Sequence, residues 1–382
     1  MKLNHLFILL AALLQISVAA HADPATRHAS IIFIQCHGLG YGDLSCYGQT
    51  NFQTPNLDRL AAEGIRFTGY YAGNAGSSPV PSALLFGKNS AAASAPNEIN
   101  LAQRLQQAGY HTGLIGEWGL SGEPWTRGFD EFAGFLNFDE GKNYYADYLW
   151  RYAPNSILDT TNNRMAAFVG KEMLYPNTGG KKEQYLPDLF MTATANFIRV
   201  NQPDQFNNFR PFFLLVNLPA PRTAATGADD FPVPTDAPFT DEHWPQAAKN
   251  RAALITRLDN GVGQVLEQLN KLNLTNNVAI FFTSAAPPEK FANTNLNFLR
   301  PNGNIRGKLE LSLPMIVHWP ETISAGQVSD FAWAAWDFAP TALEIAQFRP
   351  ATNFTGVSIL PKLLSRTQTN RLESKPQPVI AK

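Results

Sequence analysis

IIFIQCHGLGYGDLSCYG, residues 31–48, contains the clearest indication of the fold in this sequence. Its first four residues are apolar and either β-branched or aromatic, which is typical of a parallel strand covered on both faces. The strand runs into a glycine-rich loop that begins with Cys36, His37 and Gly38. Ligands of open α/β sheets bind beyond the carboxyl ends of such strands, so we expect a site here. These three residues, however, match neither a phosphate-binding loop nor the oxygen ligands of a hard cation.

Strands and helices alternate along the rest of the chain. Residues 54–64, TPNLDRLAAEG, have threonine at a helix N-cap position, proline at the first helical position and a terminal glycine, so they predict a helix. Further helices are predicted at 100–110, 251–272 and 336–348, and further strands at 65–72, 111–118, 211–221, 278–284 and 313–319. This alternation predicts an α/β fold with a mixed, mainly parallel central sheet sandwiched by helices.

Two segments, residues 121–187 and 285–312, are less periodic and rich in Asn, Pro, Gly and aromatic residues. They predict long surface excursions over the strand ends, where α/β proteins often place substrate contacts. The first segment contains an aromatic tract made of Tyr144, Tyr145, Tyr148, Trp150 and Tyr152. Such a tract either stacks on sugar rings or forms the packed base of a long loop.

The N-terminal segment indicates export. Lys2 precedes an apolar stretch from Leu6 to Ala20, and the following Ala-His-Ala triplet has the small-x-small pattern of a secretory cleavage site. We predict a signal peptide over residues 1–22, cleavage near Ala22, and a secreted or periplasmic mature protein. The apolar stretch is too short for a transmembrane helix and no second one follows, so we expect no membrane span.

Charge and cysteine content exclude two further classes of protein. Removing Lys2 with the signal peptide changes the formal charge from −1 to −2, which gives no reason to expect nucleic acid as a partner. The only two cysteines are Cys36 and Cys46, too few for a disulfide scaffold. In an oxidising compartment they either pair or serve as two separate small core residues.

Eight motifs occur in order along the chain: GLGYGDLSCYG, TPNLDRLAAEGIRFT, SALLFGK, RGFDEFAGF, PFFLLVNLPAP, DNGVGQVLEQL, LPMIVHWP and DFAPTALEIA. From about Ser30 to about Pro361 the chain thereby resembles the sulfatase family of the alkaline-phosphatase superfamily. The resemblance implies a sulfatase-like α/β domain over residues 23–361 and a C-terminal tail over residues 362–382. The small C-terminal domain of the family is expected to be shortened or absent.

Sulfatases hydrolyse sulfate esters with a formylglycine residue beside a calcium or magnesium ion. The resemblance aligns the Asp-Asp pair that holds this ion with His37 and Gly38, and the Asp-Asn pair with Ala285 and Ala286. A hard cation needs about six oxygen ligands, mostly from carboxylates. None of the four aligned residues carries a carboxylate, so we expect no metal and no cofactor.

The formylglycine precursor lies in a C/S-x-P-x-R motif, which aligns Ser77 with the modified residue and Pro81 with the arginine. Proline cannot donate a hydrogen bond to an anion, so the resemblance leaves the maturation of Ser77 unsupported. We expect Ser77 at the N-terminus of a helix that runs to about Phe86, where the helix dipole would act on it.

The remaining sulfate-binding positions also differ from the family. Glu117 stands where a lysine belongs, Arg222 replaces a histidine, and Lys308 is the remnant of a glycine-rich lysine loop. A carboxylate in such a pocket would oppose the negative charge of a transferred sulfuryl group. We predict that one pocket is shared by Ser77, His37, Glu117, Arg222 and Ala285.

These losses predict a pseudoenzyme with a sulfatase fold. One alternative is an active sulfuric-ester hydrolase with an atypical site. Another is a metal-independent esterase with Ser77 as nucleophile, His37 as base and Glu117 as orienting acid. Arg222 either binds a sulfated or carboxylated glycan bidentately or forms a salt bridge, for which Glu117 is a candidate. Another protein is the remaining kind of partner that we consider.

Overall fold

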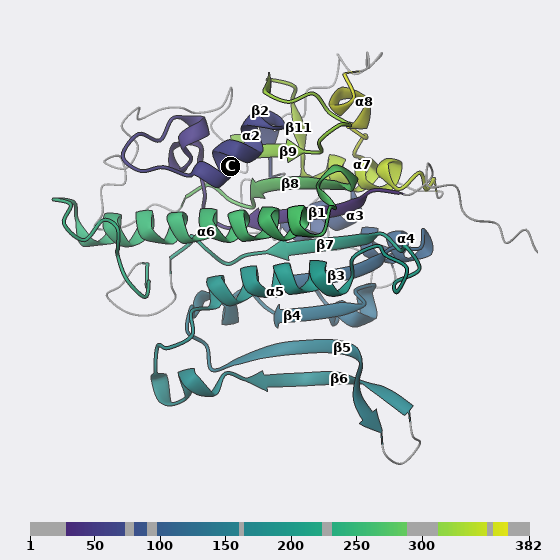
Figure 1. Ribbon diagram of the computed structural model, residues 1–382, viewed down its shortest axis with the longest axis horizontal. Coiled ribbons are helices and arrows are strands. Elements are labelled where there is room, and N and C mark those ends of the chain that lie inside the picture. The colour runs from purple at the N-terminus through teal and green to yellow at the C-terminus, as the bar shows by residue number, and fades with distance from the viewer. Residues whose placement is uncertain are drawn as a thin grey trace, which may run out of the picture.

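One sheet of eleven strands runs through the part of the chain that the computed structural model describes, namely residues 28–72, 80–89, 98–159, 164–223, 231–288, 312–349 and 354–365 (Figure 1). The strands are β1 (Ser30–Cys36), β2 (Ile65–Tyr71), β3 (His111–Glu117), β4 (Glu131–Phe135), β5 (Tyr148–Asp159), β6 (Arg164–Met173), β7 (Phe212–Asn217), β8 (Val278–Ser284), β9 (Ser312–His318), β10 (Gln327–Ser329) and β11 (Trp333–Ala334). The α-helices are α2 (Pro55–Ala62), α3 (Val80–Phe86), α4 (Leu101–Gln107), α5 (Leu186–Val200), α6 (Gln246–Lys271), α7 (Phe338–Ile345) and α8 (Leu360–Leu363).

The centre of this sheet is parallel. The strands follow one another in the order β10-β2-β9-β8-β1-β7-β3-β4-β5-β6, and β11 also pairs with β2. The run from β8 through β1, β7 and β3 to β4 is parallel throughout. Antiparallel pairing begins on one side at β9 and on the other at β5. The predicted mixed, mainly parallel sheet is confirmed.

Helices cover both faces of the sheet, as predicted. Along β1, Ile31 and Phe33 face a core that contains α3, α4 and α7, whereas Ile32 and Ile34 face a core that contains α2, α5 and α6. Figure 1 shows α5 and α6 crossing the face of the sheet nearest the viewer. Because both faces of β1 are buried, its sequence is apolar at every one of these positions rather than alternating.

The interpretation of residues 121–187 as surface excursions was wrong in part. This segment contributes β4, β5 and β6, which extend the sheet at one edge. The strands β5 and β6 form a long ribbon that is covered on fewer sides than the central strands. Arg151 and Pro154 interrupt the apolar residues of β5, and the apolar run of β6 contains two alanines, so neither strand has the β-branched run that identified β1. Of residues 285–312, only residues 285–288 and 312 are described.

The first helix begins where it was predicted, with Pro55 as its first residue, but it is capped differently from the expectation. Thr54 is the N-cap residue of α2, but its side chain makes no capping hydrogen bond and instead accepts one from the backbone N–H of Ser45 at 3.0 Å. Asp259 of α6 takes over the cap: its carboxylate accepts from the backbone N–H of Leu57 at 2.8 Å and of Asn56 at 3.2 Å. A cap supplied from another helix leaves no local sequence signal.

The other predicted elements appear close to their expected positions. The long helix begins at Gln246, earlier than the predicted residue 251, and the strand predicted at 211–221 ends at Asn217. The two cysteines, Cys36 and Cys46, are free thiols, so the alternative of separate residues holds for this pair. Within the described ranges, no helix combines the length and the apolar character that crossing a membrane requires.

Candidate functional site

The carboxyl ends of four parallel strands, β8, β1, β7 and β3, lie side by side. Cys36, the last residue of β1, is in register with Ser284, the last residue of β8. On the other side of β1, Gln35 pairs with Asn217 at the end of β7, and Asn217 also pairs with Gly116 near the end of β3. The residues that follow these strands therefore lie together beyond the carboxyl ends of the strands, which is where α/β folds bind ligands.

Backbone hydrogen bonds hold the loops at these strand ends together. Ala285 N donates to Cys36 O at 2.6 Å, and Gly38 N donates to Ala286 O at 3.2 Å. Gly38 has φ +90°, and a Cβ there would lie 3.3 Å from Cα of Arg222, so the glycine permits both the turn and the close approach. The pair His37-Gly38 and the pair Ala285-Ala286, which the resemblance aligned with metal ligands, are thus neighbours.

Glu117 and Arg222 form a buried ion pair at the same strand ends. The Nη2 of Arg222 donates to Oε1 of Glu117 and, at 2.6 Å, to the carbonyl oxygen of Phe138. The two side chains are only 1% and 3% exposed. Oε2 of Glu117 and Nε of Arg222 have no hydrogen-bond partner among the described residues. The prediction that Glu117 pairs with Arg222, made as one alternative, describes this geometry.

The chain closes directly over the Glu117 carboxylate. A Cβ placed on Gly141 would lie 1.9 Å from Oε1 of Glu117, so the glycine backbone occupies the space beside the carboxylate. Tyr144, from the aromatic tract, donates its hydroxyl to the carbonyl oxygen of Arg222 at 2.6 Å. The ion pair is thereby covered by the segment that the sequence placed over the strand ends.

Burial dominates the titration of Glu117. Removal from water disfavours the carboxylate and raises the pKa of Glu117 to about 8, although the Arg222 guanidinium and its hydrogen bond lower that pKa. A carboxyl group in this state is a poor counterpart for an incoming anion, because its ionised form would repel the anion and its neutral form still fills the space.

A second buried ion pair, which the sequence interpretation missed, supports the loop after Gly38. The Nη2 of Arg251 on α6 donates at 2.8 Å both to the Gly38 carbonyl oxygen and to Oδ2 of Asp43, and its Nη1 donates to the Pro221 carbonyl oxygen at 2.9 Å. Arg251 and Asp43 are each 1% exposed. Its signal in the sequence is an arginine on the apolar stripe of α6, at helical spacing from the buried Ile255 and Leu258.

The metal ion implied by the resemblance does not fit the residues at these strand ends. His37, Gly38, Ala285 and Ala286 supply one imidazole and no carboxylate. The nearby carboxylates of Glu117 and Asp43 are each bound to an arginine. In the described ranges, no group of three or more His, Cys, Asp or Glu side chains is arranged to hold a metal ion. Calcium and magnesium require more oxygen ligands than these residues offer.

The structure places six of the predicted site positions together, namely His37, Gly38, Glu117, Arg222, Ala285 and Ala286. Ser77 and Lys308 lie outside the described residues. The helix predicted between Ser77 and Phe86 corresponds to α3, whose described part begins at Val80.

The aromatic tract divides into two parts. Tyr144 and Tyr145 are buried and pack against Tyr185, as expected for the base of a loop. The remaining three aromatic residues are half-buried and alternate along β5: Tyr148, Trp150 and Tyr152. The packed-base interpretation therefore describes the first two residues of the tract.

Comparisons with known proteins agree with this fold. The family model described as Sulfatase matches residues 29–348. The N-acetylgalactosamine-6-sulfatase of Canis lupus familiaris is 28% identical over 384 residues, which cover 92% of this chain and 69% of the relative. The N-acetylgalactosamine-6-O-sulfatase of Bacteroides thetaiotaomicron is 27% identical over 368 residues, covering 78% and 69%.

Solved structures share the architecture. The structure of Ps i-CgsB in complex with k-i-k-neocarrahexaose superposes with a TM-score of 0.67 at 24% identity, covering 88% of this chain and 76% of that one. A second structure, which holds its substrate D-glucosamine-2-N,6-O-disulfate, superposes with a TM-score of 0.65 at 23% identity, covering 90% and 82%. At these identities the likeness establishes the fold.

Proposed function

Because this chain belongs to the sulfatase family, we propose that it is a sulfatase-like protein that no longer hydrolyses sulfate esters. The observation that carries this proposal is the buried ion pair between Glu117 and Arg222. It places a carboxyl group among the loops where a sulfuryl group would have to bind, and it occupies the arginine that would otherwise bind the anion. Transition-state stabilisation at such a site depends on cations and hydrogen-bond donors directed at the developing charge.

The loop residues support the same proposal. His37, Gly38, Ala285 and Ala286 lie together, yet they supply no carboxylate to hold a divalent cation. The two sulfatase alternatives therefore differ in a measurable way. A working sulfatase needs its ion, whereas the protein proposed here folds and persists without one.

The esterase alternative has less support from the geometry. In that alternative, a carboxylate of Glu117 would orient His37, which would in turn activate Ser77. Oε1 of Glu117 instead bonds to Arg222, and Oε2 has no hydrogen-bond partner in the described part of the chain. Glu117 thus orients an arginine rather than the proposed base.

We propose a sulfated or carboxylated glycan as the ligand class of this site, with another protein as the competing kind of partner. Several relatives are named N-acetylgalactosamine-6-sulfatase, so 6-O-sulfated N-acetylgalactosamine is the first probe to use. An anion can bind Arg222 bidentately only after Glu117 releases it, because Nη2 is already shared between Glu117 and Phe138 O. Glu117→Ala should therefore strengthen glycan binding, and Arg222→Ala should abolish it.

The decisive experiment combines turnover with thermal shift. Purified protein is assayed against aryl sulfates and 6-O-sulfated N-acetylgalactosamine, with an active N-acetylgalactosamine-6-sulfatase in parallel as the positive control. Specific cation binding to the native state would add about 2.7 kcal/mol at a hundredfold excess over Kd. We expect no turnover and no shift in Tm with calcium or magnesium.

Each alternative predicts a different result. Cation-dependent stabilisation together with formylglycine at position 77 in the peptide mass would establish an active sulfatase and overturn the proposal. Cleavage of carboxyl esters without metal, lost in both Ser77→Ala and His37→Ala, would establish the esterase.

We also propose that the protein is exported after cleavage near Ala22. The support is the sequence pattern of residues 1–22, which lie outside the described residues. Mass spectrometry of exported protein should find Asp23 at the N-terminus. An intact Met1 on a cytoplasmic product would contradict this proposal.

A further inference from the structure

The two edges of the sheet are very different. At one edge, β10 spans only Gln327–Ser329. At the other, β6 spans Arg164–Met173, contains no proline, and has no described strand on its outer side (Figure 1). Proteins usually protect sheet edges with short strands, prolines or bulges, because a long regular edge is a template for another strand. β10 is protected by its shortness. β6 is long and free of proline, although its pairing with β5 contains one register shift, between Ala153 and Ile157.

The backbone of β6 alternates in direction, and its odd-numbered residues face outward. Leu174 N, directly after β6, donates to Asp147 O at 2.7 Å, so residue 174 directs its backbone groups toward β5. In an antiparallel pair these directions alternate from residue to residue. Residues 165, 167, 169, 171 and 173 therefore direct their N–H and C=O groups away from the sheet, where another strand can bond to them.

The exposed apolar side chains on β6 have a symmetric spacing. Met165, Val169 and Met173 are 53%, 51% and 40% exposed, and they lie four residues apart on one face of the strand. When two copies of β6 run antiparallel with Val169 opposite itself, Met165 of each copy lies opposite Met173 of the other. All three exposed side chains then meet apolar partners across the interface.

The charged residues fit the same register. With Val169 on the axis, Lys171 lies opposite Ala167 and Glu172 lies opposite Ala166, so no like charges face each other. A register centred on Lys171 would place two lysines opposite each other, which is destabilising. A register centred on Phe168 would place Met165 opposite Lys171 and Val169 opposite Ala167, so the exposed apolar residues would no longer lie opposite one another.

We propose that two copies of this chain associate through β6, antiparallel and with Val169 on the two-fold axis, so that the two sheets become one. The occupant is a second copy because a strand from another protein would not require spacing that is symmetric about Val169. A two-fold axis pairs the same surface with itself, and β6 is self-complementary in that sense. This proposal does not depend on whether the protein hydrolyses sulfate esters, because β6 lies outside the site at the carboxyl ends of the central strands.

Single cysteines test the register. A short bismaleimide reagent should link Val169→Cys to itself. Met165→Cys and Met173→Cys should not link to themselves, because each position lies about 26 Å from its own copy at roughly 3.3 Å per residue. A mixture of Met165→Cys and Met173→Cys should give a cross-linked dimer. Unsubstituted protein is the control for the native cysteines, of which Cys36 is buried and Cys46 half-buried.

Analytical ultracentrifugation tests the association itself. The unsubstituted protein should show a concentration-dependent dimer, and Val169→Lys should be monomeric with an unchanged Tm at low concentration. Val328→Lys on β10, where the side chain is also exposed, is the matched control and should leave the dimer intact. A monomer at every concentration, a Val169→Lys dimer, or self-linking of Met165→Cys as efficient as that of Val169→Cys would overturn the proposal.

Discussion

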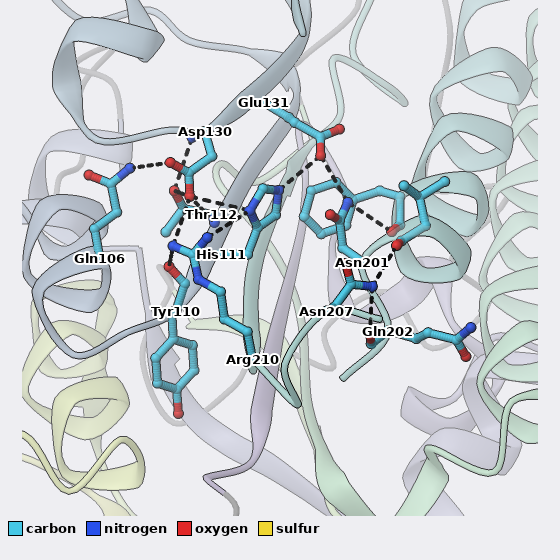
Figure 2. A network of polar contacts seen from close by, with 12 residues as sticks. Gln106, Tyr110, His111, Thr112, Asp130, Glu131, Asn201, Gln202, Asn207 and Arg210 are labelled. Carbon is cyan, nitrogen blue, oxygen red and sulfur yellow. Dashed lines mark hydrogen bonds and ion pairs between the residues drawn. The ribbon is translucent and has the colours of Figure 1, made fainter. Parts of the chain in front are cut away.

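The two ends of strand β3 carry charged groups in contrasting surroundings. At its first residue, His111 Nε2 lies 2.9 Å from Glu131 Oε1, and its Nδ1 lies 3.3 Å from Arg210 Nη1 (Figure 2). Nδ1 also lies 3.5 Å from Asp130 Oδ2, so two carboxyl groups and a guanidinium surround this imidazole. Asp130 and Asn201 add further partners, shown in Figure 2. The charged side chains of this network are partly exposed.

At its last residue, β3 carries Glu117, which shares one hydrogen bond with Arg222 and is almost fully buried. Two polar atoms of that pair have no partner in the described part of the chain. A network that retains contact with water can replace a lost bond with a water molecule, whereas a buried pair cannot. The difference indicates that charge substitutions at the strand-end site should change stability far more than those at the opposite end of β3.

The largest effect should come from Arg251, which supports the strand-end loops. Arg251→Met removes three hydrogen bonds and leaves Asp43 without its buried cation, so we expect a loss of about 3–5 kcal/mol in the free energy of unfolding. Chemical denaturation measures this loss. Arg257→Met on the same helix breaks a half-exposed pair with Asp188 and is the control, with an expected loss below about 1 kcal/mol. Equal losses of stability for Arg251→Met and Arg257→Met would contradict the expected difference between a buried and a half-exposed ion pair.

The next effect concerns the pH dependence of stability. The pKa of Glu117 is raised from its ordinary 4.5 to about 8 by burial, so between these values the folded protein holds a proton that the unfolded chain has released. Within this window the contact with Arg222 is a hydrogen bond from a cation to a neutral carboxyl group, and it becomes an ion pair when Glu117 ionises. Stability due to this group is therefore complete at low pH and falls as the pH rises through this window, by at most about 1.4 kcal/mol per pH unit.

Glu117→Gln removes the titration of this carboxyl group. The unfolding free energy of the variant should therefore fall less steeply with pH, by the amount that Glu117 contributes. Unfolding free energies measured from pH 5 to pH 8 for both proteins give the difference directly. Parallel curves for the two proteins would show that Arg222 keeps Glu117 ionised throughout, and the effect of burial would then be smaller than inferred here.

A smaller effect is expected at the glycine that covers the pair. Gly141→Ala introduces a Cβ that overlaps Oε1 of Glu117, so the loop or the carboxylate must move. We expect a loss of about 1–3 kcal/mol, typical of overpacking. Gly170→Ala is the control, because a Cβ there makes only an ordinary contact with Phe168 at 3.7 Å. Unchanged stability of Gly141→Ala would mean that the cover over Glu117 is loose.

The smallest effect should occur at the opposite end of β3. His111→Gln weakens the bonds to Glu131 and Arg210, but water and the remaining network members can take their place. We expect a loss of about 0.5–1.5 kcal/mol by chemical denaturation, the usual net value of a hydrogen bond. A loss as large as that of Arg251→Met would remove the distinction between the two ends.

Most of the central fold was predictable from local sequence. The apolar runs of β1, β7 and β8 identify strands that are buried on both faces, and the capped helix that begins after Asn100 appears where its pattern predicts it. The strand-end positions of His37, Glu117 and Arg222 also followed, because parallel strands bring their carboxyl ends to one edge. The ribbon of β5 and β6 was missed because it is covered on fewer sides, Arg151 and Pro154 interrupt the apolar residues of β5, and Gly170 and Lys171 end the short apolar run of β6.

The class of fold, the order of the central elements and the absence of carboxylates at the aligned ligand positions can all be recognised from local patterns and residue types. Which groups pair with one another depends on the tertiary structure. Asp259 caps a helix about two hundred positions away, Arg251 reaches the loop at Gly38, and Arg222 takes Glu117 as its partner. These contacts join segments far apart in the chain, and their energies depend on burial, which a local pattern does not specify.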